Sequence, residues 1–470
     1  MESTMIYLAG DFIETSKTLK IYYPYNRELF ATTYLATEAH VDEAIKAALF
    51  VKDELKRMPA FRRSEILMQI RTRLVEMHET FAQTISAESG KPIRNARTEV
   101  DRSIAIFTAA AEEAKRLPRE YIGIDWTRAG EGREGLVKYF PIGVVGGISP
   151  FNFPLNLAVH KIAPAIAAGC PIILKPSTLT PLSTLLLSTV IAETDLPKGA
   201  LSILPMDRET GNQLVTDERI ALLSFTGSPE VGWKMKNQSG KKKVVLELGG
   251  NAGVIVSDEC NLEEAVKKCV ISGYSYSGQT CIHAQRIFVQ EKIYEKFTAK
   301  FSEGVSGLVI GDPMSDVTDM SVMIDEENAI RVEDWVDDAI NNGAELIFGG
   351  KRIKNLYHPT LLTKTDNSMK VRSHEIFGPV VTIDTYTTFK EAVTKMNNTR
   401  FGLQAGVFTN RINEMNMAFN ELEVGGVILN DGPSFRVDHM PYGGIKDSGF
   451  GREGVKYAIM DMMEARILVK

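Results

Sequence analysis

Short apolar runs alternate with longer helical segments between residues 142 and 248. The runs are rich in Val, Ile, Leu and Gly, and they have the length of buried strands. They lie at 142–148, 171–175, 200–204, 220–225 and 244–248. Segments long enough for helices separate most of them, with a spacing of about 25–30 residues that is typical of βαβ units. The pattern predicts a parallel sheet covered by helices.

A second series of alternating strands and helices follows the first. The apolar runs 252–256, 286–290 and 425–429 indicate buried strands, with amphipathic stretches between them. Residues 121–140 and 465–470 alternate apolar and polar side chains, which is typical of hairpin or edge strands. A chain of 470 residues is too long for one hydrophobic core, so we predict two α/β domains and a small β segment.

Composition and charge narrow the class of protein. Hydrophobic residues make up 44% and charged residues 24%, and the net charge of -6 gives no reason to expect nucleic acid or a membrane as partner. No apolar run is long and uninterrupted enough to span a bilayer. The beginning of the chain does not resemble a signal peptide, and the four cysteines form no disulfide framework. We expect a cytoplasmic protein without a metal site.

The dinucleotide-binding pattern GxGxxG occurs twice, at residues 130–135 and 449–454. The pattern has mechanical meaning only between the strand and the helix of one βαβ unit. Neither copy follows an apolar strand, and the first precedes a segment that resembles a strand rather than a helix. We therefore interpret both copies as turns.

Cys281 has the setting best suited to chemistry among the four cysteines. It follows small and polar residues in SGYSYSGQTCI, where Gly278 allows an irregular backbone that exposes the thiol. Cys170 and Cys269 lie among apolar residues, and Cys260 has no chemical partner nearby in the sequence, so all three fit structural roles. For Cys281 the residues alone leave a nucleophile and a buried structural thiol equally open.

Two polar residues stand at the ends of predicted strands. An acid inside VVLELGG is costly to bury, so Glu247 is either paired with a lysine or is a general base with a raised pKa. Asn152, in ISPFNFPLN, is either a turn former or an amide donor for an oxyanion. FTGSPEVG at 225–232 runs from a strand into a helix whose first N–H groups favour a phosphate, although Ser228 also suits an ordinary cap.

Six motifs, in order along the chain, together resemble those of the aldehyde dehydrogenase superfamily. They are PFNFPLN, FTGSPEVG, LELGG, SGQTC, EIFGP and MPYGGIKDSGFGRE. The resemblance implies an α/β fold with an atypical Rossmann domain, a catalytic domain and a small oligomerisation hairpin, in a homodimer or homotetramer. It assigns 1–117 and 139–247 to the NAD(P)-binding domain, 248–440 to the catalytic domain, and 118–138 with 441–470 to the oligomerisation segment.

The resemblance also implies oxidation of an aldehyde to a carboxylic acid with hydride transfer to NAD(P). Cys281 would attack the aldehyde, and the Asn152 amide and the Cys281 backbone N–H would hold the oxyanion. Glu247 would activate the water that hydrolyses the resulting thioester. The cofactor-binding positions implied are Ile148, Ser149, Pro150, Phe151, Lys175, Ser177, Thr178, Gly211, Phe225, Thr226, Gly227, Ser228, Val231, Leu248, Glu375 and Phe377.

Departures from common family patterns bear on the cofactor and the substrate. NAD-preferring relatives often carry Glu where this chain has Thr178, so either NAD or NADP is expected. Thr280 stands where non-phosphorylating glyceraldehyde-3-phosphate dehydrogenases carry a phosphate-binding Arg. Arg102 and Arg436 lie on segments that line the substrate pocket in relatives, although Arg102 also fits a solvated helix face. The pattern is most similar to lactaldehyde dehydrogenase-type members, which implies a small hydroxylated or acidic aldehyde.

Other substrates and reactions stay open. Succinic semialdehyde and glyceraldehyde-3-phosphate are alternative substrates. A CoA-acylating enzyme is a further alternative that Glu247 disfavours, because such relatives usually lack this acid. The presence of Cys281, Glu247 and Asn152 together disfavours a catalytically silent member. A thiol hydrolase would need a histidine partner for Cys281, and the position of His283 two residues away does not establish that geometry.

Overall fold

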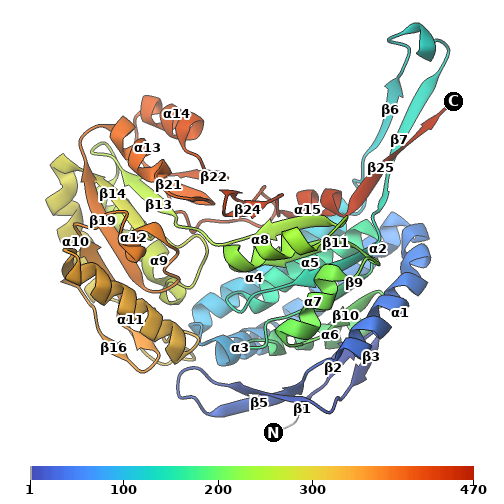
Figure 1. Ribbon diagram of the computed structural model, residues 1–470, viewed down its shortest axis with the longest axis horizontal. Coiled ribbons are helices and arrows are strands. Elements are labelled where there is room, and N and C mark those ends of the chain that lie inside the picture. Colours follow the sequence, from blue (N-terminus) through green and yellow to red (C-terminus); the bar gives the residue numbers. More distant parts are fainter. Residues whose placement is uncertain (1–2) are drawn as a thin grey trace.

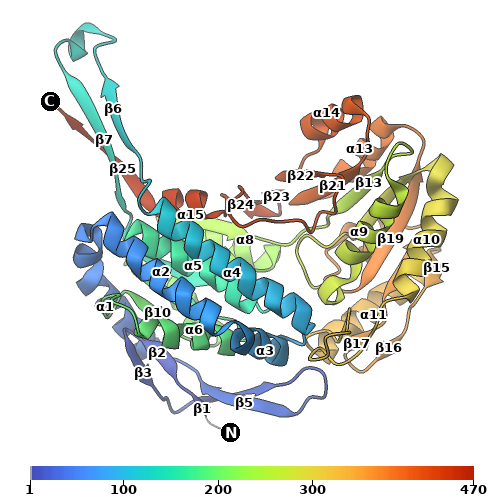
Figure 2. The same cartoon turned by 180° about the vertical axis from the view of Figure 1, so that it is seen from behind.

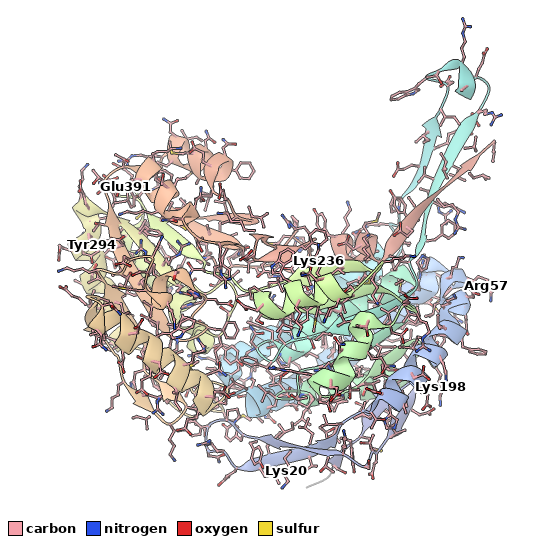
Figure 3. The ribbon with its side chains drawn as sticks, viewed as in Figure 1. Lys20, Arg57, Lys198, Lys236, Tyr294 and Glu391 are labelled. Atoms are coloured by element: carbon pink, nitrogen blue, oxygen red, sulfur yellow. The ribbon has the colours of Figure 1, made fainter. Side chains whose placement is uncertain are left out.

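The computed structural model describes residues 3–470 as two lobes and a projecting arm (Figure 1). An eight-stranded sheet lies in the first lobe, a seven-stranded sheet in the second, and a three-stranded sheet forms the arm. The same arrangement is visible from behind, where α2 and α4 cover the first lobe (Figure 2). Side chains fill the space between the ribbons, and Lys20, Arg57 and Lys198 lie exposed at the surface (Figure 3).

The first lobe is built on the strands that the apolar runs predicted. They are β8 (Val144–Ile148), β9 (Ile172–Lys175), β10 (Leu201–Ile203), β11 (Ile220–Thr226) and β12 (Lys243–Glu247). Their parallel order is β12-β11-β8-β9-β10. At the two edges, β24 (Gly449–Phe450) pairs antiparallel with β12, β2 (Ile6–Leu8) pairs antiparallel with β10, and β3 (Asp11–Ile13) pairs antiparallel with β2. The order reverses between β8 and β11, and open α/β sheets bind ligands at such a switch point.

Helices cover both faces of this sheet. One apolar core contains residues of α2 (Ala60–Glu76), α3 (His78–Ser89), α4 (Ile93–Glu113), α5 (Pro154–Ala168) and α6 (Leu182–Ala192). The other contains residues of α1 (Glu38–Arg57), α7 (Arg208–Thr216) and α8 (Pro229–Gln238). Every residue of α5 is buried, because this helix lies between the sheet and α4. Polar side chains on α5 are therefore held away from water.

The second lobe contains six parallel strands and one antiparallel strand. The parallel ones are β13 (Gly253–Val256), β14 (Arg286–Gln290), β18 (Thr360–Thr363), β19 (Val380–Tyr386), β21 (Gln404–Phe408) and β22 (Gly426–Leu429), and β15 (Glu345–Phe348) is antiparallel. Its helices are α9 (Leu262–Tyr274), α10 (Tyr294–Ser306), α11 (Glu326–Asn341), α12 (Lys370–Ser373), α13 (Phe389–Asn397) and α14 (Ile412–Glu421). Among the small pieces outside the large sheets are a three-stranded sheet of β1 (Ser3–Thr4), β5 (Leu29–Tyr34) and β4 (Thr18–Tyr22) and a hairpin of β16 (Arg352–Ile353) and β17 (Leu356–Tyr357).

The arm consists of the hairpin β6 (Arg119–Gly123) and β7 (Glu134–Pro141) with β25 (Met463–Val469) beside β7. The rest of the predicted segment 441–470 lies elsewhere. There, β23 (Ile445–Lys446) pairs with β20 (Phe401–Gly402), β24 pairs with β12, and α15 (Val455–Asp461) packs against α5. Segment 441–470 is thus divided among several parts of the fold, because its strand pairs and helix contacts differ along its length. From residue 3 onward, no helix combines the length and apolar character needed to cross a membrane.

Candidate active site

The carboxyl ends of four neighbouring strands bring predicted site residues into one row. Parallel pairing places Glu247 of β12 beside Thr226 of β11, and Phe225 beside Ile148 of β8. Ile148 in turn pairs with Lys175 of β9. The row crosses the switch point between β8 and β11, so the fold offers a binding site along this edge.

A left-handed turn precedes Cys281. Tyr276, Ser277 and Gly278 have φ values of 50°, 55° and 67°, and this conformation is strained for the two residues that carry a Cβ. Their hydroxyls donate to backbone carbonyls, at 2.7 Å for Ser277 and 3.3 Å for Tyr276. A Cβ on Gly278 would overlap the carbonyl oxygen of Gly378. The surrounding structure therefore holds the irregular backbone that the sequence predicted before Cys281.

Asn152 is attached to the backbone of the same segment. Its side-chain amide is buried and donates to the carbonyl of Gln279 at 3.0 Å, two residues before Cys281. An amide nitrogen carries two N–H groups, so the second remains free for a ligand. This contact links the loop after β8 to the segment that carries the thiol.

The two glycines of LELGG allow three segments to meet at the site. A Cβ on Gly250 would overlap the carbonyl oxygen of Cys281, and a Cβ on Gly249 would overlap the carboxylate of Glu375. The N–H of Gly250 donates to Glu375 at 3.0 Å, and burial raises the pKa of Glu375 to about 8. Close approach of backbone and carboxylate therefore explains why this loop needs glycine.

Glu247 is buried without a hydrogen-bond partner. Neither of its carboxyl oxygens is bonded to any residue in the part of the chain that the structure describes. Burial, followed by the nearby Glu453 carboxylate, raises the pKa of Glu247 well above its usual range. The structure therefore contradicts the interpretation of Glu247 as half of a lysine ion pair. The remaining interpretation is a carboxyl group that can take up and release a proton.

Lys161 and Glu453 form a buried ion pair close to Glu247. Lys161 Nζ lies 3.3 Å from a carboxylate oxygen of Glu453 and donates to the Thr226 hydroxyl at 2.7 Å. Burial alone would raise the pKa of Glu453, but Lys161 and the other nearby cations hold it below its usual range. Sequence reasoning did not assign either residue, although a lysine in the apolar segment LAVHKIAPAIA was a signal that could have found Lys161.

Tyr442 is the hydrogen-bond partner of the Cys281 thiol, with 3.1 Å between Oη and Sγ. Burial raises the pKa of Cys281 to about 11, and the bond to Tyr442 partly offsets this rise. His283 makes no such bond, and burial lowers its pKa to about 4. The geometry therefore disfavours a Cys–His hydrolase. Tyr442 was not assigned from the sequence, although it lies within the MPYGG motif.

Asp438 brings the two predicted substrate-binding arginines together. Arg102 donates to its carboxylate through Nε at 3.0 Å and Nη2 at 2.6 Å, and Arg436 Nε lies 3.7 Å from the same group. His160 Nε2 lies 2.8 Å from Asp438. Arg436 also contacts Glu453 at 3.1 Å. The structure thus contradicts the alternative of a solvated helix-face role for Arg102, because Asp438 holds it in a partly buried ion pair.

Lys175 is mostly buried yet unpaired. Its side-chain nitrogen has no hydrogen-bond or ion-pair partner within residues 3–470, and burial lowers its pKa to about 8. Gly211 of α7 leaves room for the side chain, because a Cβ there would lie 2.9 Å from the Lys175 stem. A buried amine without a partner favours a bound hydroxyl or phosphate group.

The N-terminus of α8 lies at the same edge of the sheet. Ser228 is the residue before the helix, but its side chain accepts no cap hydrogen bond, so it is not an ordinary capping serine. A Cβ on Gly227 would overlap the Phe225 ring, and a Cβ on Gly232 would overlap the Leu248 side chain. Val231 is 39% exposed. The first N–H groups of α8 therefore remain available to an anion.

The other predicted cofactor positions differ in their surroundings. Phe377 has a positive φ of 45°, and its ring meets that of Phe151 edge-on at 5.8 Å. The Ser149 hydroxyl is buried and unpaired among the described residues, Pro150 is half-buried, and Ser177 accepts a backbone N–H two residues on. These positions continue the loops that follow β8 and β9.

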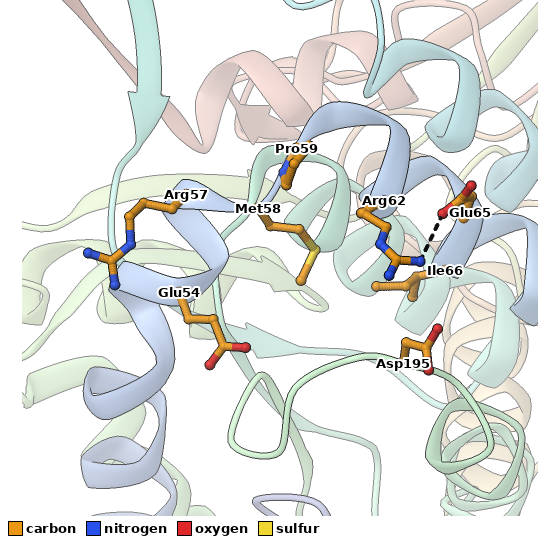
Figure 4. Close-up of a pocket in the computed structure, with 8 residues that line it drawn as sticks. All are labelled: Glu54, Arg57, Met58, Pro59, Arg62, Glu65, Ile66 and Asp195. Carbon is orange, nitrogen blue, oxygen red and sulfur yellow. Dashed lines mark hydrogen bonds and ion pairs between the residues drawn. The ribbon is translucent and has the colours of Figure 1, made fainter.

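Two cavities lie beside the first lobe rather than at Cys281. One cavity, of about 570 Å³, lies between β4 and residues 324–326. Thr178 lines this cavity, but Lys175 does not. The other, of about 330 Å³, lies where α1 meets α2, and Arg62 there pairs with Glu65 at 3.4 Å (Figure 4). No predicted site residue lines the second cavity, so cavity volume alone does not locate the chemistry.

Comparisons with known sequences place the chain in a family. The model of the Aldehyde dehydrogenase family matches residues 12–468. The 3-sulfolactaldehyde dehydrogenase of Priestia aryabhattai is 41% identical over 99% of this chain and 97% of its own length. The lactaldehyde dehydrogenase of Methanococcus vannielii is 40% identical over 96% of this chain and 97% of its own length. The chain belongs to the aldehyde dehydrogenase family.

Solved structures agree with this assignment. Aldehyde dehydrogenase 21 from Physcomitrella patens, in complex with the reaction product succinate, has a TM-score of 0.98 and 44% identity and covers 100% of this chain and 98% of its own. Glyceraldehyde-3-phosphate dehydrogenase from Methanocaldococcus jannaschii, complexed with NADP, has a TM-score of 0.92 and 37% identity. The match covers 96% of this chain and 98% of that one. The predicted fold class and the class of enzyme are confirmed.

The Cys281 thiol should react slowly at neutral pH in the free enzyme. Because its pKa is about 11, the fraction of Cys281 present as thiolate increases about tenfold with each unit of rising pH, as long as the pH is below the pKa. We expect the rate of alkylation by iodoacetamide to follow this rise from about pH 7 to about pH 10. Replacing Tyr442 by Phe should slow alkylation at each pH, because it removes a hydrogen bond that lowers the pKa. The Cys281→Ala variant gives the background, and a plateau well below pH 9 would contradict the expectation.

Proposed function

We propose that the chain oxidises a small anionic or hydroxylated aldehyde to its carboxylic acid, with Cys281 as nucleophile and NAD or NADP as cofactor. The observation that carries this proposal is Glu247, a buried carboxyl group without a partner in a site that also holds Cys281 and Asn152. A soft nucleophile, an oxyanion donor and a base are the groups that this oxidation requires.

Each protein group has a defined task in this reaction. The Cys281 thiol gives its proton to solvent water, its sulfur bonds to the aldehyde carbon, and the carbonyl oxygen becomes an oxyanion. The Asn152 amide and the Cys281 backbone N–H donate to that oxyanion. NAD(P), when bound, supplies the acceptor for the hydride that leaves this carbon. Glu247, as the carboxylate, then takes a proton from water while the water oxygen attacks the thioester carbon. The carbon–sulfur bond breaks, which releases the acid and leaves the Cys281 sulfur as a thiolate.

The charge of the cluster around Asp438 favours an anionic substrate. Burial lowers the pKa of His160 and raises that of Glu247, so burial disfavours a charge on either group. The charged groups that remain are Arg102, Arg436 and Lys161 against Asp438 and Glu453, which leaves one positive charge in excess. Two relatives are named with anionic compounds, one with sulfolactaldehyde, which has a sulfonate group, and the other with bound succinate, which has carboxylate groups. Succinic semialdehyde and lactaldehyde are therefore the first substrates to test.

The row at the carboxyl ends of β8, β9 and β11 fits a dinucleotide. Unpaired Lys175 would bind a ribose hydroxyl or a 2′-phosphate, and the first turn of α8 would face the pyrophosphate. Glu375, held by Gly250, would accept a hydrogen bond from the second ribose. Relatives in this family have been solved with NADP and with NAD. Thr178 introduces no carboxylate that would repel a 2′-phosphate.

We further propose that the chain is a homodimer or homotetramer in the cytoplasm. The arm presents β25 as an edge strand with exposed Ile467, Leu468 and Val469, and such an edge is suited to pairing with another copy. All four cysteines are free, and a Cys281 nucleophile needs a compartment that keeps thiols reduced. A CoA-acylating reaction is disfavoured, because the unpaired Glu247 is suited to activating water.

Replacing Glu247 by Gln should separate hydride transfer from hydrolysis. Loss of a general base costs about 10²–10⁴-fold in the step it serves, and the hydride leaves before water attacks. Rapid mixing should show a burst of about one equivalent of NAD(P)H per site, followed by a very slow steady state. Mass spectrometry should find the acyl group on Cys281.

Two cysteine variants control this experiment. Cys281→Ala should give neither burst nor turnover while still binding NAD(P). The matched variant Cys269→Ala should stay active, because Cys269 is fully buried within the core of the second lobe. Normal steady-state turnover by Glu247→Gln would remove Glu247 from the mechanism.

Replacing Thr178 by Glu should shift the cofactor preference toward NAD. A carboxylate near the adenosine ribose repels a 2′-phosphate and accepts hydrogen bonds from free ribose hydroxyls. The measurement is the ratio of kcat/KM with NADP to kcat/KM with NAD. An unchanged ratio would place Thr178 outside the cofactor site, facing only the cavity beside β4.

Replacing Arg102 by Leu should raise the KM for succinic semialdehyde and lactaldehyde by about 10-fold or more and leave that for propionaldehyde unchanged. The reason is that only the first two substrates carry an oxygen that the guanidinium can bind. Arg97→Leu, on the same helix but paired with Glu79 and Asp316, is the matched control. Equal effects on all three substrates would indicate a structural role for Arg102.

A further inference from the structure

Lys91 is a fully buried charge that the proposed reaction does not use. Its side chain has no exposed surface, and it follows the left-handed Gly90 that ends α3. Its Nζ forms an ion pair with Glu99 of α4, which is also inaccessible to solvent. A buried cation is costly unless strong contacts hold it, so its surroundings indicate what it does.

Two aromatic rings enclose the Lys91 ammonium group. Nζ lies 3.8 Å from the centre of the Phe153 ring and 4.6 Å from that of Tyr276, within the range of a cation–π contact. The rings meet edge-on at 6.2 Å. Phe153 directly follows Asn152, and Tyr276 is the first left-handed residue before Cys281. Lys91 thus lies between the two segments that would supply the oxyanion donors.

Glu99 fixes one of these segments from the other side. One of its carboxylate oxygens accepts the N–H groups of Leu155 and Asn156, at 3.0 and 3.1 Å, in the first turn of α5. Its other oxygen meets Lys91. The ion pair therefore joins the start of α5, the Asn152 loop and the Tyr276 turn at a single point.

Neighbouring charges do not replace this contact. Glu88 is buried as well, but it accepts the N–H groups of Leu182 and Ser183 at the start of α6, and burial raises its pKa to about 8. Arg102 lies 5.6 Å from the Phe153 ring, farther than Lys91. Of the two cations near Phe153, Lys91 is therefore the one that also reaches Tyr276.

We propose that Lys91 is a positioning residue that sets the distance between the Asn152 amide and the Cys281 backbone N–H, by holding Phe153 and Tyr276 on one ammonium group. The inference rests on the proposed function, because it concerns the oxyanion site of that reaction. It requires the Lys91 cation itself and not merely the neutralisation of Glu99. A small misplacement of such donors slows the chemical step strongly.

The double variant Lys91→Met/Glu99→Gln tests this. Met has a similar length without charge, and Gln keeps an oxygen for the N–H groups of Leu155 and Asn156. With lactaldehyde and NADP, we expect the NADPH burst rate to fall about 10- to 100-fold. The dissociation constant for NADP should not change. Alkylation of Cys281 by iodoacetamide, which needs no oxyanion site, should stay within about twofold of the unmodified enzyme.

Other variants keep the proposal open to refutation. Phe153→Leu retains the ion pair but loses one ring, and it should slow the burst in the same way. Lys56→Met removes an exposed lysine that lies 5.6 Å from the Phe140 ring, far from the site in sequence, and should leave the burst unchanged.

The outcomes separate the inference from the proposed function. A normal burst in the double variant would overturn the inference and show that Lys91 only balances Glu99. Equal losses of burst rate, alkylation rate and NADP affinity would overturn it in favour of a general structural role. Absence of aldehyde oxidation by the unmodified enzyme, with every substrate tested, would overturn the proposed function, and this inference with it.

Discussion

Parallel pairing of β9, β8, β11 and β12 is the constraint on which the rest of the structure depends. Each pair fixes the height at which one strand ends relative to the next, so Lys175, Ile148, Thr226 and Glu247 share one edge. A one-residue slip would turn every side chain to the opposite face. The buried apolar side chains on both faces of the sheet oppose such a slip. Packing in the core thus determines which polar groups meet at the edge.

The site is built at a cost in stability. Glu247 is buried, Lys175 and Glu375 are partly buried, and none of the three has an opposite charge in hydrogen-bonding contact among the described residues. Burial without such a partner moves the pKa of each group toward its neutral form. Groups in that condition respond strongly to a ligand that brings charge or hydrogen bonds, because they have little competing solvation. The same feature that costs stability therefore favours the binding of a polar ligand.

The sequence predicted the strands of the first lobe better than those of the second. It also predicted the candidate catalytic residues better than the residues that contact them. β8 to β12 lie in apolar runs that recur along the chain with helical segments between most of them, whereas no pattern indicated β18, β19 and β21. Cys281, Glu247 and Asn152 stand in distinctive local motifs. Lys161 stands in an apolar segment and Tyr442 in the MPYGG motif, but long-range contacts determine their partners, as they do for Arg102 and Asp438, which are 336 positions apart. Local patterns carry no information on such pairs.

The last segment of the chain ties the arm to the reaction centre. Glu453 contacts Lys161 and Arg436, α15 begins just after it and packs on α5, and β25 begins just after α15 and enters the arm. Only Gly454 stands between Glu453 and α15, and only Met462 stands between α15 and β25. A displacement of the arm is therefore a displacement of the anchor of that carboxylate. If the arm pairs with another copy, as proposed above, a force on the arm is transmitted through β25 and α15 to the position of Glu453.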